Sequence, residues 1–483
     1  MGFLPITIKL TQVQNRNKMN KTLIIFFIGF SFASFSQEDS TKVLSYLVFM
    51  NIVMEHHPQV YQADIARDLG SATVKTAKGG FDPILGGNLQ QKHFDGAKYY
   101  DMMSGALRIP TWFGLTAETG YETNDGAYLN PMDRRPGNGL LYAGLRLELG
   151  KGLIIDQRRA ELKKARLIEK SSDIERIILR NDLIFQASLA YYNWLKLTIQ
   201  KQTYEEAVKN AQIRFDGVVN MAIFGDRPFV DTVEANLQLQ NRLFGYNKTV
   251  QELTNTEEKL ELFLWLDGNV PLEINGKPDL NEFERLSLQQ KDISDERDSL
   301  IEQHPYIQNS LLKVNEKSID LMLKKEQLKP QLTIKYNALN EPVGNNTLGN
   351  YTPNNYAWGG TVSYPILTRK ERGEVELAKL KLQDQQFNLL QAKNELNYKI
   401  AVANNNFQVM QKQLELLQKT MSYNQVLYSS EQQLFDMGES SLFLLNIREK
   451  AFLDSQLDLV ELKYELVKTK FELEYTLLIL DNN

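Results

Sequence analysis

The chain contains no cysteine. This absence excludes disulfides, thiol chemistry and cysteine-based metal sites, and it also excludes anchoring by a lipidated N-terminal cysteine. The four histidines show no metal-ligand spacing, and we find no phosphate-binding loop, nucleophile elbow or zinc-protease motif. We therefore expect no metal, no cofactor and no enzymatic activity. The net charge of -5 argues against nucleic acid as a partner.

Long hydrophobic runs are also missing. The segment from Lys18 to Gln37 is typical of a secretory signal, because Lys18 and Lys21 precede a short apolar run at 23–30 and small residues precede a cut at Gln37. This run is too short to span a bilayer, and no other stretch approaches ~20 apolar residues. Any membrane span is therefore expected to be a β-barrel.

Glycine and proline are absent from two stretches of equal length, 153–216 and 374–437. In both, apolar residues recur at alternating steps of four and three, which is the spacing of a left-handed coiled coil. Each stretch is predicted to form one helix of roughly 100 Å. The first stripe contains Leu183, Ala187, Ala190, Trp194, Leu197, Tyr204, Val208, Ala211, Phe215, Val218 and Ala222, with Lys201 as its one interruption. The second contains Leu396, Ile400, Ala403, Phe407, Met410, Leu414, Leu417 and Met421.

The two stretches belong to halves that repeat one another. The matched pairs are Leu183 with Leu396, Gly225 with Gly438, His57 with His304, and Pro83 with Pro330. The members of the first two pairs are 213 residues apart, and the members of the last two pairs are 247 residues apart. We divide the chain into an upstream segment and signal peptide at 1–36, a first repeat at 37–269, a connection at 270–300, and a second repeat at 301–483. Each repeat is predicted to run from a helix through a β-hairpin (81–150 and 330–367) to a long helix, a tip and a returning helix.

Period-two patterns mark the predicted strands. In the second half, Leu332, Ile334 and Tyr336 alternate with polar residues, and a further strand follows at 356–364. In the first half, 85–94 and 142–149 take the same roles. This first hairpin is longer and holds two more strand candidates, at 106–109 and 115–121, which either extend the sheet or form a surface flap.

These features together resemble the TolC family of outer membrane efflux proteins. The motifs that carry the resemblance are His-Pro-x-Val/Ile at His57 and His304, Pro-x-Leu at Pro83 and Pro330, Gly225 with Asp231, and Gly438. The resemblance implies a mixed α+β fold in which three copies each give four strands to one transmembrane β-barrel. The long antiparallel coiled-coil helices would then form an α-helical barrel that crosses the periplasm of a Gram-negative bacterium.

The resemblance also implies a function and a site. The protein would be an outer membrane channel of a tripartite efflux or type I secretion system, in contact with outer membrane lipids, a periplasmic adaptor and an inner-membrane pump. The helix tips would form the periplasmic aperture and dock the adaptor. The tip residues are Phe224, Gly225, Arg227, Asp231, Phe435, Met437, Gly438 and Ser440.

One tip departs from the family pattern. Phe435 and Ser440 stand where the family has a tyrosine and an arginine, so the aspartate network that closes the pore must be rebuilt. Arg227 lies four residues before Asp231, close enough to pair if the returning helix already begins there, and is our candidate for holding it. The alternative reading of Asp231 is an ordinary acidic residue at a helix N-terminus.

Two further alternatives stay open from the sequence. Basic residues at the strand-to-helix junctions, Arg158 and Arg159 in one half and 369–372 in the other, fit either a solvated first turn or contact with lipid headgroups. The alternative for the whole chain is a secreted or periplasmic coiled-coil structural or adaptor protein. A coiled-coil structural or adaptor protein, however, does not explain the duplicated β-hairpins.

Overall fold

The structure, a computed structural model, describes residues 43–274, 276–285, 297–342 and 351–482. The predicted signal segment lies outside these residues. The α-helices are α1 Tyr46–His56, α2 Pro58–Gly79, α3 Gln157–Ile223, α4 Phe229–Glu261, α5 Glu282–Arg285, α6 Arg297–Gln303, α7 Pro305–Gln327, α8 Arg369–Asp436 and α9 Leu442–Leu477. The strands are β1 Val43–Leu44, β2 Ile84–Phe94, β3 Ala97–Pro110, β4 Leu115–Asp125, β5 Leu140–Gly150, β6 Trp265–Leu266, β7 Val270–Pro271, β8 Lys277–Pro278, β9 Gln331–Asn340 and β10 Tyr356–Ser363. Short 3₁₀ turns lie at Pro131–Asp133 and Leu480–Asn482.

Helices α2 and α7, which lead into the sheet, begin in the same way. Each has proline at its first position, where no intrahelical amide bond is lost. The residue before the proline is a histidine in both cases. The Gln59 amide donates to Nδ1 of His57 at 3.1 Å, and the Tyr306 amide donates to Nδ1 of His304 at 3.2 Å. These two histidines are therefore helix caps.

The long helices α3 and α8 contain 67 and 68 residues. Helix α3 continues beyond the predicted end at Asp216, because Gly217 sits inside the helix and the turn begins only at Phe224. One glycine costs a helix only about 1 kcal/mol relative to alanine, and the next residue, Val218, is buried against the other helices. The sequence predicts the returning helix over 230–266, but α4 ends at Glu261, because 265–266 pair with 270–271 as a short hairpin.

Among the residues that the structure describes, no helix is both long enough and apolar enough to cross a membrane.

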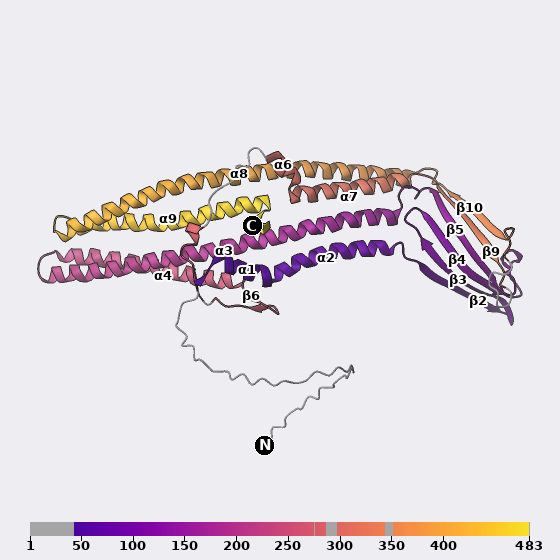
Figure 1. Cartoon of the computed structure of the whole chain (residues 1–483), viewed down its shortest axis with the longest axis horizontal. Coiled ribbons are helices and arrows are strands. Elements are labelled where there is room, and N and C mark those ends of the chain that lie inside the picture. The colour runs from indigo at the N-terminus through magenta and orange to yellow at the C-terminus, as the bar shows by residue number, and fades with distance from the viewer. Residues whose placement is uncertain (1–42, 275, 286–296, 343–350, 483) are drawn as a thin grey trace, which may run out of the picture. The chain divides into compact units, whose positions relative to one another are not determined.

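Helix α3 is the centre of the helical packing, since it contacts α2, α4, α7 and α9 (Figure 1). Its stripe is buried as predicted at Leu183, Ala187, Ala190, Trp194 and Leu197. The aromatic residues Tyr191, Tyr192 and Trp194 pack with Phe49 of α1 in the largest apolar cluster. On α8 the predicted stripe is buried from Leu396 to Phe407 and half-buried from Met410 to Met421.

The sheet has six strands in the order β10-β9-β5-β4-β3-β2, and every neighbouring pair is antiparallel. Strands β3 and β4 are the two extra candidates from the sequence, and they extend the sheet. Two expectations were therefore wrong. Strands β2 and β5 are not the two arms of one hairpin, because β3 and β4 lie between them. The described residues also place six strands in this sheet, where the resemblance implies four.

Candidate functional site: a two-faced sheet and two helix tips

The register of the sheet separates its residues into two faces. Residues directly opposite each other on paired strands share a face, and successive residues on a strand alternate between faces. One face is mostly apolar and carries Leu85, Leu89, Met103, Leu107, Ile109, Leu115, Ala117, Tyr121, Leu141, Leu145, Leu147, Ile334, Tyr336, Trp358 and Val362. The other is mostly polar and carries Asn88, Gln90, Ser104, Arg108, Glu118, Glu122, Arg146, Glu148, Thr333, Lys335, Asn337 and Thr361.

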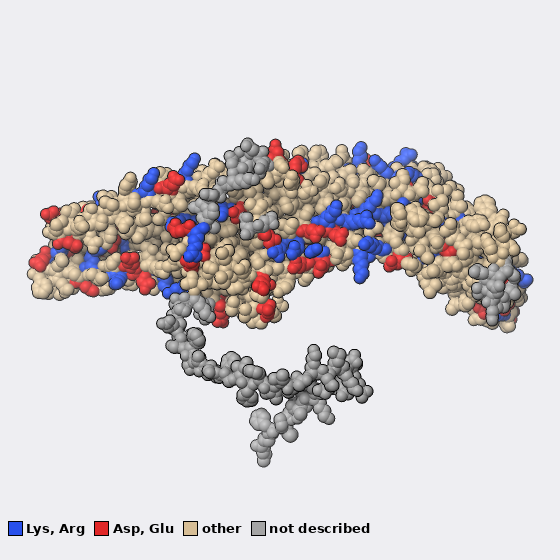
Figure 2. All heavy atoms as spheres, in the orientation of Figure 1, with Lys and Arg blue, Asp and Glu red and all other residues tan. Residues whose placement is uncertain are grey.

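The apolar face is open to its surroundings in the single chain. Leu85 is 81% exposed, and Trp358 and Val362 are each 72% exposed. Figure 2 shows few charged side chains over the sheet in the view drawn, whereas lysines, arginines and acids gather over the helices. An exposed apolar surface that extends over six strands requires a partner or a membrane to cover it.

Both edges of the sheet are also open. Strands β2 and β10 each pair with only one neighbour within the described chain, and their residues are exposed along their whole length. The strands alternate in direction across the sheet, so the two edge strands run in opposite directions. Unpaired edges of this length favour addition of another strand.

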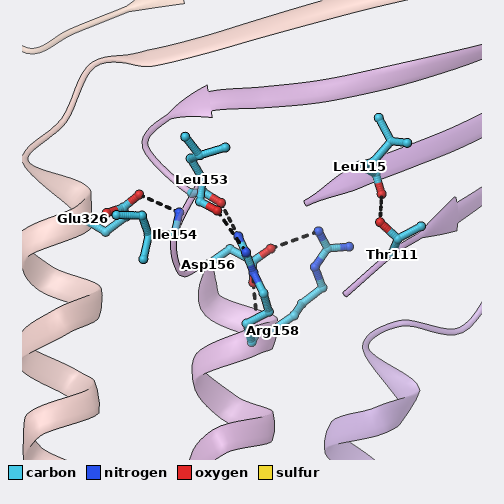
Figure 3. Close-up of polar contacts among 9 residues, drawn as sticks. Thr111, Leu115, Leu153, Ile154, Asp156, Arg158 and Glu326 are labelled. Atoms are coloured by element: carbon cyan, nitrogen blue, oxygen red, sulfur yellow. Dashed lines mark hydrogen bonds and ion pairs between the residues drawn. The ribbon is translucent and has the colours of Figure 1, made fainter. Parts of the chain in front are cut away.

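A polar network fixes the junction between β5 and α3 (Figure 3). Asp156 caps α3 by accepting the Arg159 amide at 2.8 Å. The Arg159 guanidinium donates to the Leu153 carbonyl at 3.0 Å, and Arg158 lies 3.3 Å from the Asp156 carboxylate. Glu326 on α7 accepts the Ile154 amide at 3.0 Å. Burial would raise the pKa of Asp156, but the Arg159 amide and the two guanidinium groups outweigh it and lower the pKa.

The corresponding junction between β10 and α8 is built differently. Thr368, before the first turn of α8, has a left-handed backbone with φ 45° and makes no side-chain cap. Arg369, Lys370 and Arg372 are exposed. The basic residues of the first half thus stabilise a turn, while those of the second half are exposed at the start of α8.

The two helix tips have the same backbone turn. Each long helix ends at a residue followed by a glycine with positive φ, 84° at Gly225 and 79° at Gly438. The next amide then bonds back to a carbonyl five residues earlier, at 2.9 Å in both tips (Asp226 to Met221, Glu439 to Leu434). This is a Schellman turn, in which glycine takes the left-handed position at little cost.

The structure brings three of the predicted tip residues together. Arg227 lies 3.5 Å from the Asp231 carboxylate and 4.3 Å from the centre of the Phe435 ring. Phe435 packs with Val218 and Leu445, so it belongs to an apolar cluster that joins both helical hairpins. Phe224 and Met437 are exposed at 80% and 64%. Ser440 donates to Glu431 and does not contact Asp231.

A second polar contact between the hairpins was not predicted. Arg214 on α3 donates to both carboxylate oxygens of Glu449 on α9, with the Nη2–Oε1 distance at 3.1 Å, and to the Tyr428 hydroxyl on α8 at 3.4 Å. Burial would lower the pKa of Arg214, but Glu449 outweighs it and raises the pKa. Next to this pair, Asn446 donates to Glu234 on α4 at 3.2 Å. The network therefore links all four helices near the tips.

A groove lies beside this network, with a volume of about 470 Å³. It runs between α3 and the α8–α9 hairpin and reaches Gly217, Met221, Gln432 and Asp436. No atom lies within 4 Å of the position that a Cβ at residue 217 would take. Because glycine has no side chain, this side of the groove stays open.

Comparison with known proteins gives a consistent result. Residues 297–477 match the family described as outer membrane efflux protein. No curated protein sequence matches the chain. Among solved structures, the CmeC outer membrane channel of Campylobacter jejuni is similar with a TM-score of 0.62 and 15% identity, covering 95% of this chain and 94% of that one. The outer membrane protein VceC of Vibrio cholerae has a TM-score of 0.63 and 13% identity, covering 89% and 95%.

CusC is similar to the same degree, with a TM-score of 0.63, 15% identity and coverage of 89% of this chain and 91% of that one. At these identities the solved structures establish a shared fold, and the family match covers the second half of the chain. The described chain therefore shares the fold of these outer membrane channels, and its residues 297–477 match the outer membrane efflux protein family.

Proposed function

We propose that three copies of the chain form an export duct, which carries substrates from a periplasmic adaptor and an inner-membrane pump across the outer membrane. The observation that carries this proposal is the two-faced sheet with two open edges. A sheet that is apolar on one side and polar on the other fits lipid outside and water inside. In lipid its edges must be paired, because unpaired backbone groups there cost several kcal/mol each.

Pairing between copies removes both edges at once. Because β2 and β10 run in opposite directions, β2 of one copy can join β10 of the next and continue the antiparallel pattern. Closure by a ring of copies leaves no edge. Six strands from each of three copies make a barrel of eighteen strands, within the range of known outer membrane barrels. This barrel would be wider than the twelve-stranded barrel that the resemblance implies.

The helices support the same assembly. Large apolar residues remain exposed on α8 and α4 in the single chain, including Phe387 at 70% and Phe244 at 74%. Apolar side chains in such numbers favour burial against another protein surface. Neighbouring copies would cover them and close a helical tube that continues from the barrel to the tips.

The tips are the proposed aperture and the proposed docking point for the adaptor. Three copies of Asp231 would meet around one axis, where like charges repel unless they are compensated. Arg227 contacts Asp231 within the chain and supplies that compensation. The exposed Phe224 and Met437 and the groove at Gly217 offer apolar contacts for the adaptor.

Membrane fractionation tests the duct directly. We expect the protein in the outer membrane fraction as an oligomer that survives mild detergent and dissociates to a monomer on heating. A monomer in the soluble periplasmic or secreted fraction would contradict the proposal and favour the coiled-coil structural or adaptor alternative. That alternative leaves the apolar sheet face in water, which the hydrophobic effect disfavours.

A further inference from the structure

We propose that the polar face of the sheet carries an anion-binding site, formed by Arg108, Arg146 and Lys335 around the buried Glu118. This inference rests on the proposed duct, because it takes the polar face as the lining of the water-filled lumen. The four residues come from four adjacent strands, β3, β5, β9 and β4. Their register places all of them on the same face.

The geometry concentrates positive charge around one carboxylate. The Glu118 side chain is 2% exposed. Its Oε1 lies 3.0 Å from Arg146 Nη2 and 3.6 Å from Arg108 Nε, and its Oε2 lies 3.0 Å from Lys335 Nζ. One cation is enough to neutralise a carboxylate, so the cluster keeps two positive charges in excess.

The neighbouring acid does not remove the excess. Glu148 lies on the same face two residues beyond Arg146, and it forms no ion pair among the described residues. Counting Glu148, three cations stand against two carboxylates in each copy. Glu122, further along β4, is already paired with Arg135 at 2.8 Å. Repulsion among the three cations is relieved when an anion binds next to them.

The cations are accessible from the lumen side. Arg108, Arg146 and Lys335 have 58%, 36% and 37% of their side chains exposed, while the carboxylate beneath them is covered. The exposed donors include guanidinium groups, which bind carboxylate, sulfate and phosphate oxygens in pairs. The ligand class is therefore a small inorganic or organic anion, or an anionic group of a passing solute.

The cluster lies near the helix-side end of the sheet, where it could select among solutes that enter the barrel. Arg108 lies two residues before the helix-side end of β3, and Lys335 lies four residues after the helix-side start of β9. Solutes that leave the helical tube would meet the cluster as they enter the barrel. Repeated in every copy, it forms a ring of cationic side chains, which is a device for anion selectivity in pores.

Planar-bilayer recordings of the purified full-length oligomer test the site. In a KCl gradient we expect the reversal potential to show preference for chloride over potassium, and inorganic phosphate to reduce the current. Lys335→Gln and Arg108→Gln should each shift the reversal potential toward cations and weaken the phosphate effect about tenfold, the loss expected for a hydrogen bond to a charged group. The matched control is Lys92→Gln, which removes one positive charge from the same face far from the cluster.

Glu118→Gln provides a test of opposite sign, because it removes the compensating charge and should strengthen the preference for chloride. Channels whose selectivity and phosphate effect are the same in wild type, Lys335→Gln and Arg108→Gln would overturn the site and leave the duct intact. An oligomer that conducts no ions in any variant would overturn the duct, and the site with it.

Discussion

The two helix tips share one backbone turn but use different side chains to stabilise it. At the first tip, α4 starts after Pro228 without a side-chain cap, and Arg227 bridges Asp231 and the Phe435 ring. At the second tip, Ser441 caps α9 by accepting the Leu444 amide at 3.2 Å. The second tip is thus held by a neutral cap, while the first holds a partly exposed ion pair.

We propose that this difference marks the first tip as the one with a charge-dependent role. A Schellman turn needs only glycine and fixes the reversal of the chain in both hairpins. A partly exposed ion pair adds little stability, typically below about 1 kcal/mol. We propose that the pair at the first tip serves ion contact or gating, while the contacts that join the two hairpins lie deeper, at Arg214 and Phe435.

Removing the buried cation should have the largest effect. Arg214→Met leaves the Glu449 carboxylate, whose side chain is only 7% exposed, without its partner. We expect the free energy of local opening at the tips to fall by about 3 to 5 kcal/mol, measured by hydrogen exchange of the α9 amides. Lys209→Met, an exposed position on the same helix, is the control and should change little.

Removing the buried ring should have the next largest effect. Phe435→Ala opens a cavity in the cluster between the hairpins and removes the ring beneath Arg227. We expect a loss of about 3 kcal/mol in the same opening free energy. Phe224→Ala truncates an exposed ring at the other tip and should be nearly neutral. Equal losses for the two variants would show that the tips are not joined through Phe435.

Substituting the glycine of the turn that both tips share should have a smaller effect on stability, of similar size at each tip. Gly225→Ala and Gly438→Ala each force a side chain into the left-handed region, so both should destabilise their tip by about 1 to 2 kcal/mol. Gly217→Ala is the control of opposite sign, because that glycine lies inside α3 and its substitution should stabilise the helix by roughly 0.5 to 1 kcal/mol. Proteolysis rates at the tips can rank the three variants.

The ion pair at the first tip should affect stability least and conductance most clearly. We expect Arg227→Ala to loosen the closed tip and raise single-channel conductance. Asp231→Ala removes a negative charge from the tip, so it should shift the reversal potential further toward chloride and reduce block by multivalent cations. If neither substitution changes conductance or selectivity in bilayer recordings, Asp231 is an ordinary N-terminal helix residue and the aperture lies elsewhere.

Features that depend on local sequence were predictable. The stripe from Leu183 to Leu197 follows from spacing along one helix, and the turns at Gly225 and Gly438 follow from the need for a left-handed residue. The closeness of Arg227 to Asp231 was also predicted, but for a different reason: α4 begins only at Phe229, so Arg227 reaches Asp231 from the turn before the helix and not from the same helix face.

Features that depend on pairing between distant segments were not predictable. The alternating pattern at 115–121 indicates a strand, but it contains no information on whether β4 joins the sheet or folds away from it. The contact between Arg214 and Glu449 joins residues of different repeats, and nothing in the spacing of either residue indicates the other. The cluster around Glu118 likewise depends on the order and register of four strands.

Closure of the sheet edges between copies is the central claim, and cross-linking measures it most directly. The chain has no cysteine, so a pair of engineered cysteines, Asn88→Cys on β2 and Thr361→Cys on β10, can be joined by a short bifunctional thiol reagent in outer membranes. Both positions lie on the polar face, at opposite edges of the sheet. We expect covalently linked dimers and trimers from the double variant, and only monomers from Thr361→Cys together with Leu390→Cys on α8. Monomers alone from the edge pair, in a protein that still reaches the outer membrane, would show that the sheet edges do not pair between copies.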